Sequence, residues 1–326
     1  MPAALEALAA FPVSTEGVTL VNVSENVTFK VTDAASGAPL ALRLHRPGYH
    51  TLAELESERL WTAALDEVGI TAPVGLRARD GAYYVEVAIP ERGERRLAGL
   101  TRWTEGALLV DILGEEPDAA ARRGWFFRLG LLLARLHDQA GAWPAPPTFT
   151  RHRLDSDGLV GERPFWGPFW DHPTMSADQR QLILATRETI RAALGRIGTD
   201  PSGFGLIHAD LHPHNVIVSG EDLGAIDFDD SGFGWHLYDI AVALVHREND
   251  PDFAAVRDAL LAGYRSQRAL GAEAEALLPM FTLIRRLAQI GWVQQRPELA
   301  GPGIDHFIET AIPMACERCR AFRAPV

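Results

Sequence analysis

Hydrophobic and polar residues alternate over much of the first hundred residues, which is the pattern of half-buried strands. The segment 17–31 is rich in β-branched residues and is interrupted at 24–26, so it predicts two strands around a tight loop. A third strand is expected at 39–45, where alternate leucines share one face. This region therefore predicts a small antiparallel sheet.

The same region also predicts a helix and further strands. Residues 51–68 have a helical pattern with Thr51 as the N-cap. Strands are expected at 74–78 and 82–88, because the Asp-Gly pair between them is a strong hairpin signal. A short strand-like run at 97–104 ends in Glu-Gly.

Beyond residue 106 the hydrophobic period changes to that of α-helices. Short strands interrupt this pattern within 203–227. The predicted helices lie at about 118–140, 176–197, 236–247, 252–270, 273–296 and 303–322. We therefore expect a bilobal α+β fold with an N-lobe at 1–100, a hinge connector at 101–106 and a mainly helical C-lobe at 107–326.

The composition indicates a soluble protein that does not bind nucleic acid. The formal net charge of -12 opposes binding to a phosphate backbone, which proteins contact through clustered Lys and Arg. No apolar stretch approaches the ~18 residues of a membrane span, and the N-terminus lacks a positively charged signal segment. Cys316 and Cys319 lack a second pair of ligands, so we expect reduced helical cysteines. A cytoplasmic monomer or homodimer is expected, and its acidic charge suits a cationic small molecule.

Two polar clusters, each bordered by apolar strands, carry the candidate chemistry. The first is HADLHPHN at 208–215, in which Asp210 precedes Asn215 by five residues. The second is IDFDD at 226–230, in which Asp227 follows an apolar strand. Phosphoryl transfer needs a base near the acceptor hydroxyl and cations that neutralise the phosphate oxygens. A carboxylate base, with an amide and a second carboxylate as magnesium ligands, meets both needs.

These motifs resemble those of the aminoglycoside-phosphotransferase and choline-kinase superfamily, whose fold is protein-kinase-like. The resemblance covers residues 17 to about 250. The text IDFDD and the Arg-Pro-Gly after the third strand are shared with bacterial stress-response kinases and homoserine-kinase-like proteins. It implies an ATP- and Mg²⁺-dependent kinase acting on a hydroxyl of a small molecule, such as an aminoglycoside, an amino alcohol or a homoserine-like compound.

The resemblance also implies roles for individual residues. Asp210 is the expected catalytic base, and Asn215 and Asp227 are the expected metal ligands. The residues expected to bind the nucleotide are Arg43, Glu58, Ser24, Asn26, Thr101 and Trp103, the last two beside the adenine. Those expected to support the loop or bind the acceptor are His208, His212, Asp229, Asp230 and Trp166. Asp239 resembles a structural aspartate of the family.

The sequence departs from the family pattern in two places. Kinases of this type carry a Lys on the third strand that holds the phosphates and pairs with a helix Glu, whereas this chain has Arg43. Arginine keeps the charge and can bind phosphate through two N–H groups. Its expected partner is Glu58, with Glu56 and then Glu54 as alternatives. The phosphate loop at 23–26 also lacks glycine, which restricts close approach of the backbone to phosphate.

Other functions fit parts of the sequence. A metallohydrolase could use the alternating set His208, Asp210, His212 and His214. Pro213 disfavours a continuous strand there, and this function leaves Asn215 unexplained. A protein Ser/Thr kinase of the stress-response type would use the same motifs, because the fold does not select the acceptor. A non-catalytic nucleotide-binding module is less favoured, since the base and both metal ligands are present.

Overall fold

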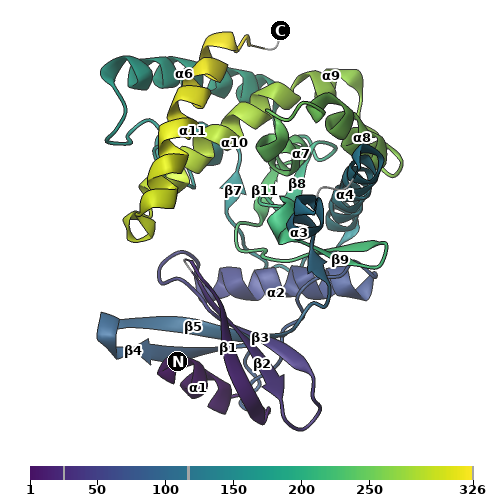
Figure 1. Cartoon of the computed structure of the whole chain (residues 1–326), viewed down its shortest axis with the longest axis vertical. Coiled ribbons are helices and arrows are strands. Elements are labelled where there is room, and N and C mark those ends of the chain that lie inside the picture. The colour runs from purple at the N-terminus through teal and green to yellow at the C-terminus, as the bar shows by residue number, and fades with distance from the viewer. Residues whose placement is uncertain (25, 116–117, 325–326) are drawn as a thin grey trace. The chain divides into compact units, whose positions relative to one another are not determined.

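A computed structural model describes residues 1–24, 26–115 and 118–324 of the chain (Figure 1). Its contacts divide the chain into two compact units, and each unit joins segments that are distant in the sequence. The first unit contains Met1–Ala107, Trp143–Arg151 and Ile217–Asp229, and the second contains Leu108–Ala142, His152–Val216 and Asp230–Val326. The predicted α+β class, with an antiparallel sheet and many helices, is confirmed.

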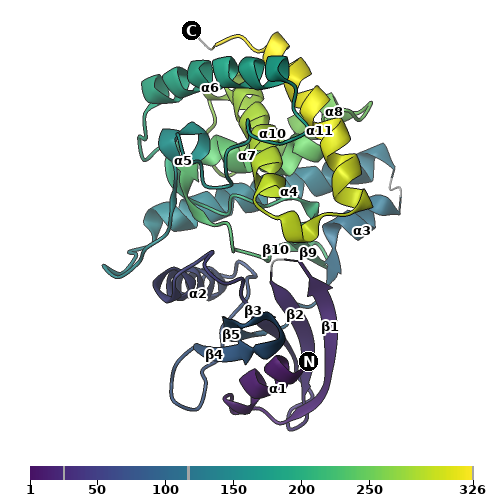
Figure 2. The same ribbon diagram turned by 90° about the vertical axis from the view of Figure 1, so that its left-hand side faces the viewer.

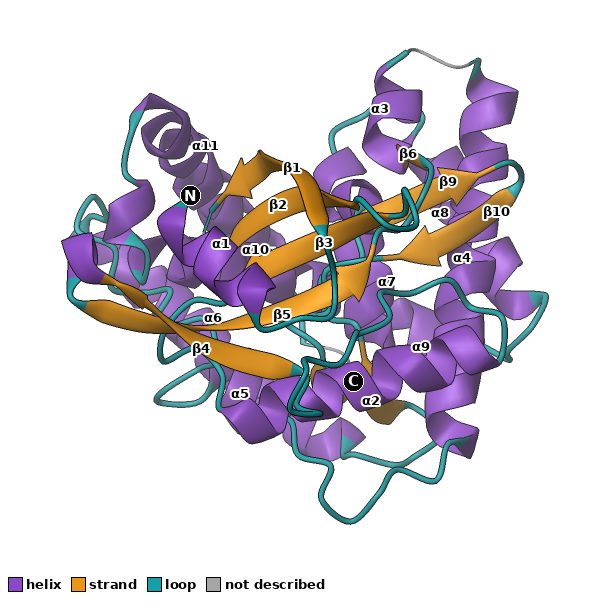
Figure 3. Cartoon of the chain, turned by 90° about the horizontal axis from the view of Figure 1, so that it is seen from below, coloured by secondary structure: helices purple, strands orange, loops and turns teal. Residues whose placement is uncertain are grey.

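The first unit is built on a five-stranded antiparallel sheet in the order β1-β2-β3-β5-β4 (Figure 3). Its strands are β1 (Thr15–Val23), β2 (Val27–Asp33), β3 (Pro39–Leu44), β4 (Tyr84–Ile89) and β5 (Glu94–Arg102). The alternate leucines of β3 are buried in one hydrophobic core with Phe29 and Val31. Helix α1 (Pro2–Ala9), which the sequence analysis did not predict, packs Ala4, Ala7 and Leu8 into the same core.

Helix α2 (Leu52–Glu67) begins where the sequence predicted. The Thr51 hydroxyl accepts the backbone N–H of Glu54, and the Glu54 carboxylate accepts that of Thr51, which completes a capping box. The hydroxyl of Tyr84 donates to the carbonyl of Leu55 at 2.9 Å and so ties α2 to β4. Three short strands, β10 (Asp222–Ala225), β9 (Val216–Ser219) and β6 (Ala107–Leu108), form a separate sheet in that order.

The prediction of a strand at 74–78 is wrong. This stretch forms only an isolated bridge between Gly75 and Thr101, and β4 pairs with β5 instead. Gly75 and the preceding Pro73 disfavour regular pairing. The Asp-Gly turn does form, since the N–H of Ala78 donates to the carbonyl of Ala82 at 2.7 Å. The hairpin signal therefore identified the turn but not the strand pair, whose real connection contains η1 (Pro90–Arg92).

The second unit is mainly helical, and Figures 1 and 2 show α10 and α11 side by side within it. Its helices are α3 (Leu109–Gly114), α4 (Ala119–Ala142), α5 (Ser156–Val160), α6 (Ala177–Ile197), α7 (His236–Leu244), α8 (Phe253–Arg265), α9 (Ala272–Ala276), α10 (Leu278–Gln294) and α11 (Pro302–Ala321). A small sheet has the order β7 (Arg153–Leu154), β11 (Gly232–Trp235), β8 (Phe204–Ile207). Single turns η2 (Pro213–Asn215), η3 (Val245–Arg247) and η4 (Pro297–Leu299) complete the unit.

Helices α4 and α8 are in backbone contact through two glycines. A Cβ atom on Gly130 would collide with the carbonyl of Leu260, and one on Gly263 would collide with the carbonyl of Phe127. Glycine is therefore required for this spacing. The close approach brings His137 of α4 to Tyr264 of α8, and the ring Nδ1 lies 2.9 Å from the hydroxyl.

Each helix predicted beyond residue 106 has a counterpart at about the same position, except that the expected 273–296 helix is divided into α9 and α10. The short helices α3 and α5 were not predicted. Both cysteines are free and buried on α11. Across the described ranges, we find no helix that combines the length and the apolar character needed to span a membrane.

Candidate active site

The loop 208–215 connects β8 to β9 and contains the first predicted motif. Its residue Ala209 has a positive φ of 67°, and Asp227 of the second motif has a φ of 62°. They are the two non-glycine residues with positive φ in the part of the chain that the structure describes. Such backbone conformations cost free energy and concentrate at functional sites, where surrounding contacts enforce them.

Asp239 on α7 holds the loop backbone in this conformation. Its buried carboxylate accepts the backbone N–H of His208 at 3.0 Å and that of Ala209 at 2.6 Å. Burial raises the pKa of Asp239 above its ordinary value, although His208 and these backbone donors act in the opposite direction. His208 is itself buried, and its Nδ1 accepts the N–H of Asp210 at 3.3 Å. These contacts give Asp239 and His208 supporting positions behind the loop.

The network behind Asp239 extends to His137 and Tyr264. His137 Nε2 lies 3.1 Å from the Asp239 carboxylate. Burial lowers the pKa of His137 to about 3, so the ring is neutral. A carboxylate only accepts, so Nε2–H donates to Asp239, and Nδ1 accepts the hydroxyl of Tyr264. With this tautomer, the hydrogen bonds run from Tyr264 through His137 to Asp239.

Asn215 is bonded directly to Asp210. Its Nδ2 group donates at 2.9 Å both to the backbone carbonyl and to the carboxylate of Asp210. Because the amide nitrogen serves both bonds, Oδ1 is the Asn215 atom left to ligate a cation. An amide oxygen beside a carboxylate is the donor set that Mg²⁺ prefers.

Arg285 of α10 was not predicted from the sequence. Its NH2 group donates to Asp210 Oδ1, and His212 Nε2 lies 3.4 Å from Oδ2. Burial by itself raises the pKa of Asp210, but His212 and Arg285 lower it below the ordinary value. The carboxylate is therefore ionised. The signal in the sequence was an arginine among the apolar residues of α10, where a charge is uncommon unless it is paired.

Trp166 lies beside Arg285, the partner of Asp210. Its indole Nε1 donates to Asp230 Oδ2 at 3.0 Å, and its ring stacks on Tyr238 with a centroid separation of 5.6 Å. The Arg285 guanidinium lies 5.9 Å from the Trp166 ring centroid. At Gly291 of α10 an added Cβ would come within 2.5 Å of the Gly167 carbonyl, so the helix packs closely against this segment.

In the first unit, Arg43 pairs with Asp227. The Arg43 NH2 group lies 2.5 Å from Asp227 Oδ1. Burial lowers the pKa of Arg43, but the carboxylates of Asp227, Asp229 and Glu58 raise it above the ordinary value. The guanidinium is therefore positively charged.

The expected ion pair between Arg43 and Glu58 does not form. Glu58 Oε2 instead lies 3.6 Å from the NH1 group of Arg151. Glu56 pairs with Arg59 at 2.8 Å, and Glu54 is occupied in the cap of α2. Arg43 pairs with Asp227 because the forked guanidinium of arginine extends further than the lysine ammonium group of the family pattern. Burial raises the pKa of Glu58 to about 7, despite the opposing charge of Arg151.

Asp229 is held by groups from several segments of the first unit. Asn26 Nδ2 donates to its carboxylate at 3.0 Å, and His45 Nδ1 lies 3.8 Å from it. His50 Nε2 lies 2.7 Å from its backbone carbonyl, which also accepts from Arg151 at 2.5 Å. Burial raises the pKa of Asp229, but Arg43 and His45 lower it overall. Asp229 thus serves as a buried anchor, and Asn26 as its tie to the β1–β2 loop.

The remaining predicted nucleotide residues lie on or next to the five-stranded sheet of the first unit. The N–H of Ser24 donates to the carbonyl of Asn26 at 3.0 Å, which closes the tight β1–β2 turn, whereas Glu25 lies outside the described residues. Thr101 pairs with β3. The N–H of Trp103 donates to the carbonyl of Pro39 at 3.1 Å, and its ring lies 4.5 Å from Lys30 Nζ. In this structure, the Trp103 N–H is thus engaged with β3.

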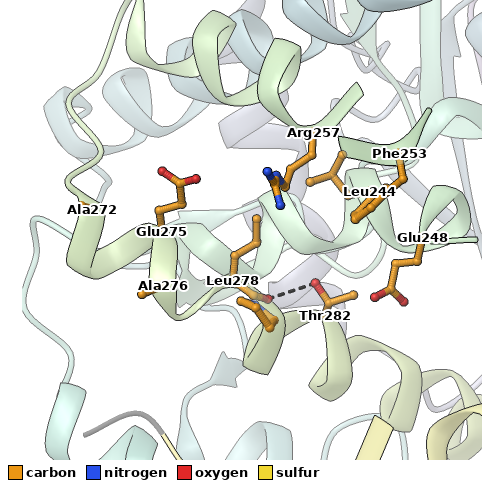
Figure 4. Close-up of a pocket in the computed structure, with 10 residues that line it drawn as sticks. Leu244, Glu248, Phe253, Arg257, Ala272, Glu275, Ala276, Leu278 and Thr282 are labelled. Carbon is orange, nitrogen blue, oxygen red and sulfur yellow. Dashed lines mark hydrogen bonds between the residues drawn. The ribbon is translucent and has the colours of Figure 1, made fainter. Parts of the chain in front are cut away.

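A separate pocket of about 390 Å³ opens in the second unit (Figure 4). It is lined by side chains from the end of α7, from α8 and α9, and from the start of α10. The lining residues are Leu244, Glu248, Phe253, Arg257, Ala272, Glu275, Ala276, Leu278, Pro279 and Thr282. None of the predicted site residues is among them, so this pocket is distinct from the cluster around Asp210.

The family relationship can now be stated. The phosphotransferase enzyme family matches residues 18–277, which include both motifs. The chain belongs to this family. Its members catalyse group transfer, so the chain is an enzyme, as predicted. The metallohydrolase and the non-catalytic module are not supported.

Individual relatives agree with this assignment. The homoserine kinase of Mesorhizobium japonicum is 44% identical over 222 residues, which cover 66% of this chain and 61% of that protein. The structure of a microcompartment-associated aminopropanol kinase aligns with a TM-score of 0.80 at 32% identity, over 96% of this chain and 94% of that one. An amicoumacin kinase, solved with AMP-PNP and Ca²⁺, has a TM-score of 0.77 at 19% identity over 96% and 92%, which shows the fold alone.

Proposed function

We propose that this protein is an ATP- and Mg²⁺-dependent kinase that phosphorylates a hydroxyl group of a small amine-bearing molecule. Asp210 acts as the base, and Asn215 and Asp227 hold the metal. The observation that carries the proposal is the double hydrogen bond from Asn215 to Asp210. It holds a base and a metal-binding amide in one loop, whose backbone Asp239 fixes.

The residues present suit a magnesium nucleotide. The Asp227 side chain is 43% exposed and its backbone has a positive φ, as expected for a carboxylate kept available for a ligand. Asn215 adds an amide oxygen, and both are hard oxygen donors. Bound Mg²⁺ would neutralise the phosphate oxygens and the charge that develops on them. Arg43 would release one N–H group from Asp227 to a phosphate oxygen.

Asp210 then accepts the proton of the acceptor hydroxyl. Its carboxylate is ionised, so it can take a proton as the oxygen attacks the γ-phosphorus. Because the transition state is loose, positioning of the hydroxyl contributes more than strong basicity. A lowered pKa is therefore compatible with this role.

Small amino alcohols and hydroxy amino acids are the acceptors we favour over a protein hydroxyl. The homoserine and aminopropanol kinases that resemble this chain are named for such compounds. The match covers 61% of the homoserine kinase, so homoserine kinase activity is a proposal for this chain.

A panel assay tests the proposal. ADP formation from ATP would be measured with amino alcohols, hydroxy amino acids, aminoglycosides and a Ser/Thr peptide, with Mg²⁺ or with EDTA. We expect Mg²⁺-dependent turnover of at least one small acceptor, and its loss in Asp210→Asn. Turnover of the peptide alone would favour a protein kinase, and absence of nucleotide binding would exclude the proposal.

A further inference from the structure

Two buried hydrogen-bond donors lie beside the base without acceptors. Arg285 is 7% exposed and Tyr238 is 0% exposed. The Tyr238 hydroxyl lies against the Arg285 guanidinium, which can only donate to it, so this contact supplies no acceptor. In the region that the structure describes, neither the Nε–H of Arg285 nor the O–H of Tyr238 has an acceptor. Buried donors in folded proteins nearly always have partners, so such a pair indicates a missing acceptor.

The two donors belong to one cluster. Tyr238 and Asp210 both act on the Arg285 guanidinium strongly enough to raise its pKa, although burial opposes this. Burial also raises the pKa of Tyr238, so its hydroxyl keeps its proton and remains a donor. Trp166 stacks on Tyr238 and forms an apolar wall. The missing acceptor must therefore be an oxygen that receives bonds from an N–H and an O–H next to Asp210.

The phosphates of ATP are a poorer match than the acceptor. The first unit already supplies a cation for them, Arg43, which is paired with the expected metal ligand Asp227. Arg285 instead contacts the carboxylate that must meet the acceptor hydroxyl. A cation attached to the base carboxylate lies where the acceptor binds.

We propose that Arg285 and Tyr238 bind a carboxylate of the acceptor, so that the substrate is a hydroxy amino acid rather than a plain amino alcohol. This inference rests on the proposed kinase function and specifies its substrate class. Asp230, which Trp166 orients through its indole N–H, offers a carboxylate in the same cluster for the substrate ammonium group. A zwitterion thus finds a charge of opposite sign for each of its own.

Binding of the acceptor would also prepare the base. When the substrate carboxylate takes the Arg285 guanidinium, Asp210 Oδ1 becomes available to the hydroxyl. The hydroxyl oxygen then forms its bond to the γ-phosphorus, its proton passes to Asp210, and the bond from the γ-phosphorus to the β–γ bridging oxygen breaks, with its electron pair leaving on ADP. No other reactant is needed.

Matched acceptor pairs that differ only by the carboxylate test this inference. L-homoserine is compared with 3-aminopropan-1-ol, L-threonine with 1-aminopropan-2-ol, and L-serine with ethanolamine. For the pair with the highest turnover, we expect wild-type kcat/KM to favour the carboxylated member by roughly 10- to 100-fold, the range for hydrogen bonds to a charged group. Arg285→Gln should abolish this preference, and Tyr238→Phe, which keeps the stacking ring, should reduce it by about fivefold.

Arg285→Lys retains the charge and should keep part of the preference. Arg257→Gln serves as a control, because it removes one exposed guanidinium from the same unit and also alters the separate pocket of Figure 4. It should leave the preference unchanged. If Arg257→Gln loses the preference for the carboxylated acceptor and Arg285→Gln keeps it, the acceptor binds in that pocket and the inference is overturned.

Calorimetry separates failure of this inference from failure of the proposed function. Binding of each member of the pairs is measured with a non-hydrolysable ATP analogue and Mg²⁺, so no turnover is required. Carboxylate-dependent binding that Arg285→Gln removes supports the inference even if the panel shows no phosphorylation. If Arg285→Gln weakens the binding of both members of a pair equally, Arg285 acts on the base or the phosphoryl group and not on an acceptor carboxylate. If the wild type binds both members equally, an acceptor carboxylate is also excluded.

Discussion

Asp210 in the second unit and Asp227 in the first are each paired with an arginine, buried Arg285 and half-buried Arg43, but their surroundings differ. The Asp210 loop is fixed by backbone bonds to the single carboxylate of Asp239. Around Asp227, three carboxylates (Asp227, Asp229 and Glu58) act on Arg43, and Arg151 is the second arginine of the group. The Asp210 region is therefore organised by backbone hydrogen bonds, and the Asp227 region by charge.

Substitutions at Asp210 and Asp227 should distinguish loss of the chemical step from loss of nucleotide binding. Asp210→Asn keeps the side-chain size but removes the base, so turnover should fall by about 10²- to 10⁴-fold. Calorimetry should show Mg²⁺-ATP affinity near that of wild type. Turnover within about threefold of wild type would remove Asp210 from the chemical step, since base removal usually costs at least ~10²-fold.

Asp227→Ala should affect both properties. Loss of one stabilising contact to the transition state predicts a fall in turnover of about 10²- to 10³-fold. In contrast to Asp210→Asn, Mg²⁺-ATP affinity should also weaken, which a magnesium titration of nucleotide binding would measure. Unchanged magnesium dependence in a folded variant would contradict the metal assignment.

The rigidity of the Asp210 region can be tested at Asp239. Asp239→Asn replaces one acceptor oxygen with a donor facing backbone N–H groups, so the free energy of unfolding should fall by about 1–3 kcal/mol. Loss of loop geometry should lower kcat by roughly 10- to 100-fold, as for other supporting contacts, while KM for ATP changes little. Urea denaturation and steady-state kinetics measure these effects, with the exposed Asp258→Asn as a control. An unaltered kcat would show that the loop holds its conformation without Asp239.

A smaller effect is expected at Arg43, where charge should matter more than shape. Arg43→Ala should raise KM for ATP by about tenfold, because a charge-assisted bond to phosphate is lost. Arg43→Lys keeps the charge and should stay closer to wild type. If Arg43→Ala retains the wild-type KM, Lys30 on β2 is the next cation to test.

The smallest expected effect is a pH dependence of stability from Glu58. Its pKa is raised to about 7 in the folded protein, against an ordinary value of 4.5. The fold therefore favours the protonated form, and this stabilisation is complete below about pH 4.5 and is lost as pH rises through about 7. Glu58→Gln imitates the protonated form, so it should remove part of the loss between pH 5 and pH 8. Identical pH profiles of the free energy of unfolding would show that Glu58 is not so perturbed.

What the sequence predicted, and what it missed, follows from how far apart the interacting residues are. Asp210 and Asn215 are bonded to each other across five residues, so their spacing alone indicated one shared loop. Arg285 reaches Asp210 across 75 residues, and Arg151 reaches Asp229 across 78. Neither has a local pattern that names its partner. The same limit applies to Arg43, whose pairing with Asp227 depends on how the sheet and the IDFDD segment fold together.

The structure also explains an error of a different kind. The strand expected at 74–78 has suitable local residues, but it meets only the end of β5, through the bridge between Gly75 and Thr101, because β4 pairs with residues 94–99 of that strand. The length of strand that a neighbour leaves open is a property of the assembled sheet, and the propensity of a single segment does not contain it.

The glycine contact between α4 and α8 has a genetic consequence. Gly130 and Gly263 set the helix spacing that lets Tyr264 reach His137, and His137 in turn bonds the aspartate that supports the catalytic loop. A random mutagenesis screen for loss of kinase activity should therefore recover alleles at these two positions, although neither contacts a substrate. Such alleles would be expected to be temperature-sensitive, because the added methyl group separates two helices without replacing any reactive side chain.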